Sequence, residues 1–180
     1  MVIFINGSFG IGKTTVARGL VARLPGSVLF DPELHGLVLQ RLARPFKRID
    51  DFQDLRAWRA GSVRLIRLAR LLRPTVVVPM AFSNEAYLGE VVDGIRSFDV
   101  DTLHFCLTAP LAVVQHRLQQ REGRRGPTPW QLRRAAECCT EHQRPQYAVH
   151  VATQDRSSHD VVEDMLTQLR SRAPVQAASA

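Results

Sequence analysis

The stretch GSFGIGKT at residues 7–14 constrains the fold of this chain more than any other feature. It matches the Walker A pattern G-x-x-x-x-G-K-[ST] in full. An apolar run over Val2–Asn6 precedes it and a helical pattern follows, which is the strand–loop–helix context of a phosphate-binding loop. Glycines let backbone N–H groups turn towards phosphates, and the helix N-terminus adds partial positive charge. The stretch therefore predicts a triphosphate site.

The motif also predicts which residues contact the nucleotide. Lys13 is expected to reach the β and γ phosphates and to act in catalysis, and the Thr14 hydroxyl is expected to bind Mg²⁺. ATP and Mg²⁺ are thus the expected cofactors. The predicted nucleotide-binding residues are Gly7, Ser8, Phe9, Gly10, Ile11, Gly12, Lys13, Thr14, Thr15 and Arg117.

Strands and helices alternate along the rest of the chain. Apolar and β-branched runs predict strands at Val2–Asn6, Ser27–Asp31, Thr75–Met80, Asp101–Leu107 and Val149–Gln154. Helices are expected up to about 24 and over about 32–42, 54–72, 84–97, 112–121, 131–141 and 158–170. This order predicts an α/β fold: a three-layer α/β/α P-loop NTPase with a five-stranded parallel sheet, of the small-kinase type with a lid. We expect a single domain over 1–172, a lid at about 122–129, and a disordered tail at 173–180.

Composition narrows the class of partner. The formal net charge is +7 and only two basic residues are lysines, which admits nucleic acid, a membrane surface or a polyanionic small molecule as partner. Arginine suits bidentate phosphate contacts, and the alternative is that much of it forms a solvated surface. The arginines are spread over several elements without a nucleic-acid motif, so a small-molecule partner is expected rather than nucleic acid. No signal peptide or long apolar run appears, so we expect a cytoplasmic protein with no transmembrane segment. The basic amphipathic segment at 54–72 leaves peripheral membrane contact open, and no pattern indicates an oligomeric state.

A carboxylate, Asp31, follows the second predicted strand. Parallel strands place their carboxyl ends at one edge of the sheet, so Asp31 is expected on the same side as the phosphate loop. A kinase needs a base or orienting group there for the acceptor hydroxyl, and Asp31 suits that role and a place beside Thr14 at the metal. Glu33 is a second candidate, towards substrate or metal-bound water. The alternative is that Asp31 only caps a helix beginning at Pro32.

The third predicted strand ends without an acid, in Val78-Pro79-Met80. Motor-type and AAA-type ATPases need an acid there to activate water, so the sequence argues against them. It is compatible with a small kinase, in which an acceptor hydroxyl replaces water, and with ATP that is bound but not cleaved. Met80 is a candidate for contact with the substrate.

Arginines supply the third element of the predicted site. Arg117 and Arg121 lie four residues apart on one helical face, and Arg124 and Arg125 follow in a loop rich in Gly and Pro. Such a cluster suits closure over ATP and stabilisation of charge on the transferred group, so Arg117 and Arg121 are candidate catalytic residues. The alternative is a solvated basic helix end. Arg59 is a separate candidate for holding the substrate.

The order of phosphate loop, carboxylate and arginine-bearing lid resembles the nucleoside-monophosphate kinase and shikimate kinase group. More specifically, the chain resembles the tunicamycin-resistance ATP-binding proteins. The matching blocks are Ile5-Asn6-Gly7, Phe9-Gly10, Gly12-Lys13-Thr14, Asp31-Pro32-Glu33, Asp50-Asp51-Phe52-Gln53, Trp58-Arg59 and Val78-Pro79-Met80. They cover roughly the first half of the chain, and the second half matches in general layout.

That resemblance implies ATP binding and interaction with tunicamycin, a hydroxyl-rich nucleoside antibiotic that contains uridine. It implies an acceptor pocket formed by Asp51, Phe52, Gln53, Trp58 and Arg59. Amide and carboxylate groups suit sugar hydroxyls or uracil, and an indole offers a stacking face. The alternative for Phe52 and Trp58 is a place in the core.

Three hypotheses follow. In the first, the chain is a small-molecule kinase that transfers phosphate from Mg-ATP to a hydroxyl of a nucleoside- or sugar-like acceptor and so confers tunicamycin resistance. In the second, it sequesters a nucleoside-like ligand in an ATP-dependent manner without chemistry. In the third, which the sequence favours least, it is a basic nucleotide binder associated with nucleic acid.

Overall fold

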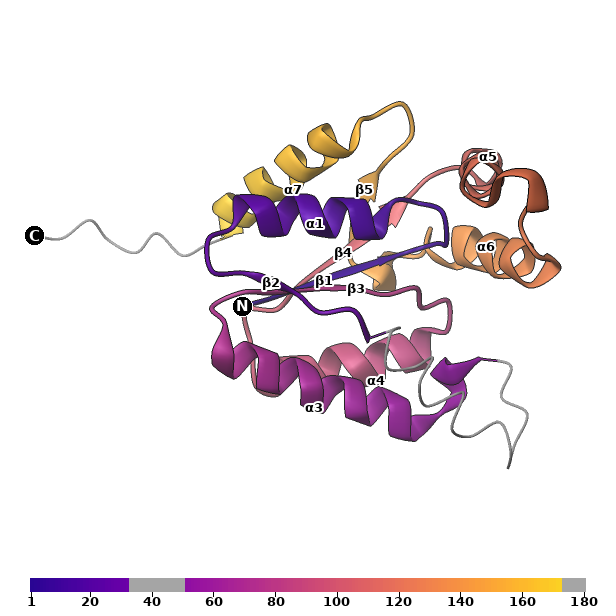
Figure 1. The fold of residues 1–180 in the computed structure, drawn as a ribbon. Helices are drawn as coiled ribbons and strands as arrows, with labels where there is room; N and C mark the ends of the chain where they lie inside the picture. The colour runs from indigo at the N-terminus through magenta and orange to yellow at the C-terminus, as the bar shows by residue number, and fades with distance from the viewer. Residues whose placement is uncertain (33–50, 173–180) are drawn as a thin grey trace, which may run out of the picture.

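The computed structural model describes residues 1–32 and 51–172 (Figure 1). Glu33, the body of the helix expected at about 32–42, and the tail 173–180 lie outside the described residues. The strands are β1 (Val2–Gly7), β2 (Val28–Leu29), β3 (Val76–Pro79), β4 (Leu103–Thr108) and β5 (Val149–Ala152). They form one sheet in the order β2-β3-β1-β4-β5 with all neighbours parallel, which confirms the expected five-stranded parallel sheet.

Helices cover both faces of the sheet and its carboxyl end. They are α1 (Lys13–Arg23), α3 (Arg56–Leu72), α4 (Glu85–Arg96), α5 (Leu111–Glu122), α6 (Pro129–Glu141) and α7 (Ser158–Arg172). Three short 3-10 helices are η1 (Phe52–Asp54), η2 (Gly123–Arg125) and η3 (Pro145–Tyr147). In Figure 1, α1 and α7 pack together on one face and α3 and α4 on the other, while α5 and α6 lie beyond the carboxyl ends of the strands. The three-layer α/β/α fold is therefore confirmed.

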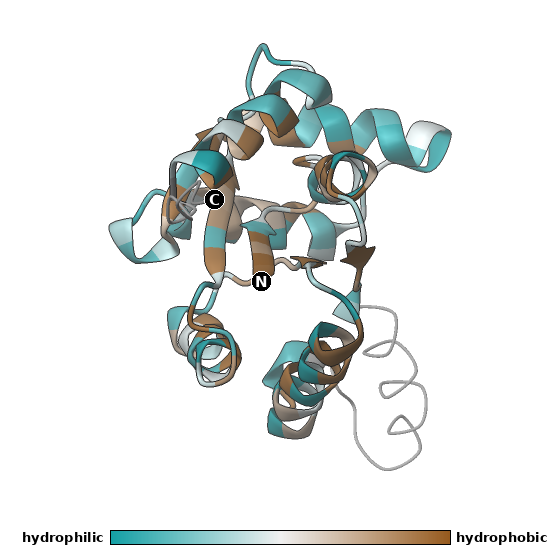
Figure 2. Ribbon diagram, turned by 90° about the vertical axis from the view of Figure 1, so that its left-hand side faces the viewer, coloured by the Kyte–Doolittle hydropathy of each residue, from teal (hydrophilic) through white to brown (hydrophobic). Residues whose placement is uncertain are grey.

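The central strand β1 supplies both halves of the core. Its side chains alternate between the two faces, as they do in any strand. Ile3 and Ile5 pack against α1 and α7, whereas Val2 and Phe4 pack against α3 and α4. The strand is thus an unbroken apolar run, as is usual for a parallel strand covered on both faces. The surrounding helices carry both hydrophobic and hydrophilic residues (Figure 2).

Several boundaries differ from the sequence-based expectation, and those of α3 and β2 bear on the site. The long helix α3 begins at Arg56 rather than at Asp54, because the Asp51 carboxylate accepts a hydrogen bond from the Gln53 N–H (2.9 Å) and fixes a separate turn, η1. Strand β2 is only two residues long and pairs with β3 alone, at the edge of the sheet. The chain therefore leaves the sheet before Asp31, and this residue lies beyond the carboxyl end of β2.

The helix α6 begins two residues earlier than expected because its N-terminus is doubly capped. The Thr128 hydroxyl accepts a hydrogen bond from the Gln131 N–H (3.2 Å), and the Gln131 side chain accepts one from the Thr128 N–H (2.7 Å). Pro129 occupies the first helical position, where its missing N–H is not needed. These contacts fix the start of the helix that carries Arg134.

Trp58 is a central part of the core beneath α3. Its side chain is fully buried, its ring lies 6.0 Å from that of Phe82, and its indole N–H donates to the Pro32 carbonyl (3.2 Å). We expect Trp58→Ala to lower the free energy of unfolding by about 3–5 kcal/mol, because it leaves a large cavity. Urea denaturation measures the loss. Trp130→Ala, at a half-buried position, is the control and should lose clearly less, and equal losses would contradict this packing.

Two buried histidines make stability depend on pH. Burial lowers the pKa of His104 to about 4, and burial also lowers that of His142 to about 4, although its hydrogen bond to the Phe82 carbonyl opposes the shift. Both folded-state pKa values lie below the ordinary 6.5, so protons bind the unfolded chain first. These two histidines should therefore leave the free energy of unfolding unchanged above pH 6.5. As the pH drops towards 4, the free energy of unfolding should fall by about 1.4 kcal/mol per pH unit for each of the two histidines.

Urea denaturation between pH 7 and pH 4 measures this dependence. His104→Leu should reduce the slope, since it removes one of the two groups. His159→Gln is the matched control, because the His159 side chain is 70% exposed, and it should leave the slope unchanged. An unchanged slope in His104→Leu would contradict the assignment.

Candidate active site

The loop between β1 and α1 needs glycine at two positions. Gly10 and Gly12 have φ values of 76° and 102°, in the left-handed region that side chains disfavour. A Cβ on Gly10 would also lie 2.8 Å from Cγ of Leu118 on α5, so the loop approaches this helix closely. The loop leads into α1, whose N-cap residue Gly12 makes no side-chain capping bond. The first N–H groups of α1 are thus placed for an anion.

The Lys13 side chain lies along this loop. Its ammonium donates to the Ser8 carbonyl (2.9 Å) and lies 5.5 Å from the centre of the Phe9 ring. The Phe9 ring in turn packs edge-on against Trp130 of α6, with 5.3 Å between the ring centres. The first two contacts hold the Lys13 ammonium beside the phosphate loop. The contact between Phe9 and Trp130 connects this loop to α6.

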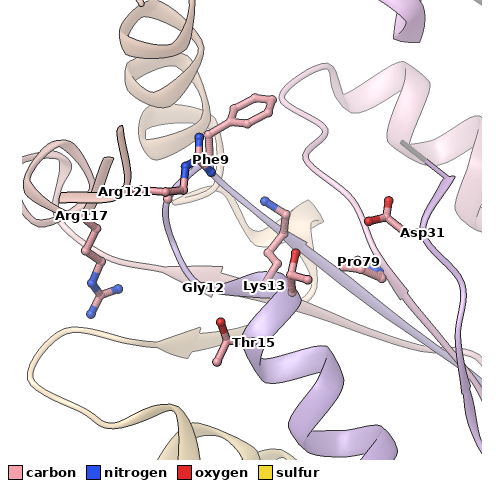
Figure 3. Close-up of a pocket in the computed structure, with 10 residues that line it drawn as sticks. Phe9, Gly12, Lys13, Thr15, Asp31, Pro79, Arg117 and Arg121 are labelled. Atoms are coloured by element: carbon pink, nitrogen blue, oxygen red, sulfur yellow. The ribbon is translucent and has the colours of Figure 1, made fainter. Parts of the chain in front are cut away.

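A cavity of about 350 Å³ opens beside the loop (Figure 3), and it is called the nucleotide cavity below because most residues expected to bind nucleotide line it. It is lined by Phe9, Gly10, Gly12, Lys13, Thr14, Thr15, Asp31, Pro79, Arg117 and Arg121. Three of these side chains are cationic and one is a carboxylate, which gives the cavity the charge that suits a polyphosphate. Most of the residues expected to bind nucleotide therefore line one cavity, whereas Gly7, Ser8 and Ile11 are buried and do not line it.

Two arginines from α5 close one side of this nucleotide cavity. Arg117 is anchored, because its guanidinium donates to the Thr153 hydroxyl (2.9 Å), the Thr153 carbonyl (2.8 Å) and the Ile11 carbonyl (3.3 Å). Arg121 is half exposed and pairs with Glu122 (2.8 Å). Arg124 and Arg125, which belong to η2 in the expected lid, are exposed and do not line the cavity.

Asp31 lies across the nucleotide cavity from the two arginines (Figure 3). It follows β2, and Pro79 at the end of β3 lies between it and the phosphate loop, in line with the strand order β2-β3-β1. The carboxylate and Lys13 thus face a common space from opposite sides. Met80, expected to contact substrate, is instead buried in the core, and its neighbour Pro79 lines the cavity.

A second cavity, of about 620 Å³, lies beside α6 and is called the α6 pocket below. It is lined by Asp51, Gln53, Asp54, Ser83, Asn84, Tyr87, Arg134, Ala136, Glu137, Thr140 and Glu141. The sequence analysis placed Asp51 and Gln53 in the acceptor site, and the structure brings these two together here. The Phe52 side chain lies outside the described residues.

Arg134 is the centre of the α6 pocket. Its guanidinium contacts Asp51 (3.2 Å) and Glu137 (2.8 Å) and donates to the Ser83 hydroxyl (2.6 Å). Burial raises the pKa of Asp51, against the opposing effects of the Gln53 N–H and of Arg134. Burial by itself lowers the pKa of Arg134, but its hydrogen bond with Glu137 and the charge of Asp51 raise it above its ordinary value. The guanidinium is therefore a fixed positive charge.

The segment after β3 is held in place by hydrogen bonds with three buried side chains, those of Asn6, His142 and Tyr147. The Asn6 side chain exchanges two hydrogen bonds with the Phe82 backbone (2.8 and 3.1 Å), and the His142 ring donates to the Phe82 carbonyl (2.6 Å). The Tyr147 hydroxyl donates to the Ser83 carbonyl (2.6 Å). Ser83 is thereby presented to Arg134 in one orientation.

Trp58 and Arg59 line neither cavity, which corrects their expected place in the acceptor pocket. The Trp58 indole is buried, so it offers no free stacking face. Arg59 is paired with Glu90 (2.8 Å), donates to the Gln53 carbonyl and lies 4.0 Å from the centre of the Tyr87 ring. Arg59 therefore positions two residues of the α6 pocket from behind.

Arg134 was missed by the sequence analysis, which considered arginines only as far as Arg125. A spacing pattern in the sequence could have identified Arg134. Arg134, Glu137 and Glu141 are three and four residues apart and so share one face of α6. Ser83 and Tyr87 carried no such signal. They reach the pocket because the segment after β3 and the first turn of α4 line it together with α6.

The fold and the nucleotide cavity together define a class: a P-loop domain of the kinase-like type. A family model described as an AAA domain matches residues 2–145, and the chain belongs to this family. That family name corrects the argument against an AAA-type protein. The local observation behind that argument stands, since β3 ends in Pro79 and is followed by Met80.

Solved structures resemble the chain over nearly its full length, whereas a comparison with curated protein sequences gave no match. The tunicamycin resistance protein of Deinococcus radiodurans is 28% identical, with a TM-score of 0.77 over 94% of this chain and 95% of that one. A gluconokinase from Sinorhizobium meliloti 1021 has a TM-score of 0.68 at 16% identity, over 94% and 91% of the two chains. The shikimate kinase of Acinetobacter baumannii, in complex with shikimate, has a TM-score of 0.65 at 15% identity, over 96% and 94%. The resemblance inferred from the sequence blocks is thus confirmed.

None of the helices within residues 1–32 and 51–172 has the length and apolarity needed to cross a membrane. In those residues no three His, Cys, Asp or Glu side chains come together as a ready-made metal cluster.

Proposed function

We propose that the chain is a phosphotransferase that moves the γ-phosphoryl group of ATP to a hydroxyl of a small nucleoside- or sugar-like molecule. The observation that carries the proposal is the nucleotide cavity, in which Lys13, Asp31, Arg117 and Arg121 face one space. A motor ATPase needs an acid that activates water, and β3 ends without one. An acceptor hydroxyl beside Asp31 supplies the nucleophile instead.

Each residue has a role in the proposed transfer. Lys13 and the N–H groups of the loop bind the β and γ phosphates, and Arg121, with Arg117 behind it, stabilises negative charge on the transferred group. Asp31 orients the acceptor hydroxyl and takes its proton while the new oxygen–phosphorus bond forms and the bond to ADP breaks.

The residues present also fit a magnesium ion. Thr14 is an exposed hydroxyl at the first turn of α1, and Asp31 is a carboxylate on the same cavity, which are the oxygen ligands that Mg²⁺ prefers. When bound, the ion would neutralise phosphate charge.

The α6 pocket is the proposed acceptor site, and tunicamycin is the first acceptor to test. The candidate rests on the likeness to the Deinococcus radiodurans resistance protein and on the hydroxyl, amide and carboxylate groups that line the pocket. A resistance protein has an alternative route, since ATP-dependent sequestration of the drug needs no proton acceptor. The two functions differ in their products.

Mass spectrometry separates the two functions. The purified chain is mixed with Mg-ATP and tunicamycin, and transfer predicts a drug product heavier by one phosphoryl group that does not form without ATP. Tight drug binding with no such product would instead favour sequestration.

A further inference from the structure

The nucleotide cavity and the α6 pocket have opposite charge. The nucleotide cavity is lined by Lys13, Arg117 and Arg121 against a single carboxylate. The α6 pocket is lined by four carboxylates, those of Asp51, Asp54, Glu137 and Glu141, against one guanidinium, and Glu141 is also paired with Arg144 (3.1 Å), which does not line the pocket. A polyanion is therefore attracted to the first cavity and repelled by the second.

The single guanidinium of the α6 pocket is already neutralised. Arg134 contacts Asp51 at 3.2 Å and Glu137 at 2.8 Å, so two carboxylates of the chain occupy the positions where the carboxylate or phosphate of a ligand would bind. The side chains of Arg134 and Asp51 are each 16% exposed, and water screens their attraction only weakly. An anionic ligand would have to displace one partner and leave its negative charge unpaired nearby.

Apart from Ala136, the other residues that line the pocket carry neutral hydrogen-bonding side chains. Ser83, Asn84, Tyr87 and Thr140 offer hydroxyl and amide groups on the same walls. These groups, together with free carboxylate oxygens, suit the donors and acceptors of sugar hydroxyls and uncharged heterocycles.

We propose that the α6 pocket selects acceptors that carry no negative charge, such as nucleosides and neutral sugars, and rejects monophosphates and sugar acids. The proposal rests on the proposed phosphotransferase function and narrows its substrate class. It separates the chain from a fold neighbour such as the shikimate kinase, because shikimate is a carboxylate. The Asp51–Arg134–Glu137 cluster is the device that excludes anions.

Matched pairs of ligands test the selection. Dissociation constants for uridine and uridine 5′-monophosphate, and for glucose and gluconate, are measured by calorimetry with a non-hydrolysable ATP analogue filling the phosphate loop. Each anion is expected to bind about tenfold or more weakly than its neutral partner. An anion that binds as tightly as its neutral partner would overturn the proposal.

A variant that removes two negative charges tests the Asp51–Arg134–Glu137 cluster directly. This test distinguishes the outcomes even where the neutral ligands bind weakly. Asp51→Asn with Glu137→Gln should raise affinity for uridine 5′-monophosphate about tenfold or more, because Arg134 is then free to bind the phosphate. Glu137→Gln alone, at a half-exposed side chain, should give a smaller gain if the double variant folds poorly. No gain in anion affinity in either variant would refute the role of the cluster.

The control variant keeps the same change in net charge. Glu163→Gln with Asp164→Asn removes two carboxylates from α7, remote from the α6 pocket, and should leave anion affinity as in the wild type. Because these tests measure ligand binding and not transfer, failure of the charge selection is distinguishable from failure of the proposed function. Phosphorylation of an anionic acceptor would contradict the selection while supporting transfer, and charge selection without transfer would do the reverse.

Discussion

Asp31→Asn is expected to lower the rate of phosphoryl transfer by about 10²–10⁴-fold while ATP affinity measured without Mg²⁺ stays close to that of the wild type. The amide keeps the size and hydrogen-bonding reach of the carboxylate but cannot take the proton of the acceptor hydroxyl. Asp31 faces the nucleotide cavity from the β2 side, across from Arg117 and Arg121, so nucleotide binding has other partners. Product formation under saturating ATP and acceptor measures the effect.

The control for this variant is Asp101→Asn. Asp101 is an exposed carboxylate before β4, at the amino end of the sheet and therefore remote from the cavity. The same chemical change there should leave transfer unchanged. Transfer by Asp31→Asn at the wild-type rate would show that Asp31 is not the base and would favour its role as a helix cap.

Lys13→Ala is expected to lower transfer by about 10²–10³-fold and, unlike Asp31→Asn, to weaken ATP binding as well. The ammonium is held over the loop by the Ser8 carbonyl at 2.9 Å, from where it can reach the phosphates. It would contact them both before and during transfer, so its removal affects binding and rate together. Calorimetry with ATP and the transfer assay measure the two effects.

Arg18→Ala is the control for Lys13→Ala. It removes one exposed positive charge from the same helix, α1, but its side chain does not line the cavity. A general effect of net charge would appear in both variants, whereas a direct phosphate contact would appear only in Lys13→Ala. Unchanged ATP affinity in Lys13→Ala would contradict the assignment of the phosphate loop.

The donor half of the proposed site was predictable from the sequence because its signals are local. The loop needs glycines and a lysine at fixed spacing, and Asp31 follows a strand whose direction fixes the edge at which it emerges. The structure brings Lys13, Asp31, Arg117 and Arg121 to one cavity, as the order of strands and helices implied. The order of elements does not predict how much of α5 and of the following loop reaches the cavity, and Arg124 and Arg125 are exposed and do not line it.

The acceptor half was predicted only in part because it depends on which side chains packing leaves exposed to the pocket. Trp58 and Arg59 are consecutive residues on α3, yet the Trp58 ring is buried in the core. The Arg59 guanidinium is paired with Glu90 and packs on the Tyr87 ring. Arg134 comes from a helix more than seventy residues further on. Its contact with Asp51 arises only when α6 folds over the end of the sheet.

The fate of the γ-phosphoryl group tests the central claim most directly. In a single-turnover reaction with ATP labelled at the γ-phosphate, tunicamycin or another neutral nucleoside is supplied in excess and the label is followed. Transfer predicts that the label appears in the acceptor as a phosphate ester, in step with the formation of ADP. Label that stays in ATP while the acceptor binds, or that appears only as inorganic phosphate, would contradict the account.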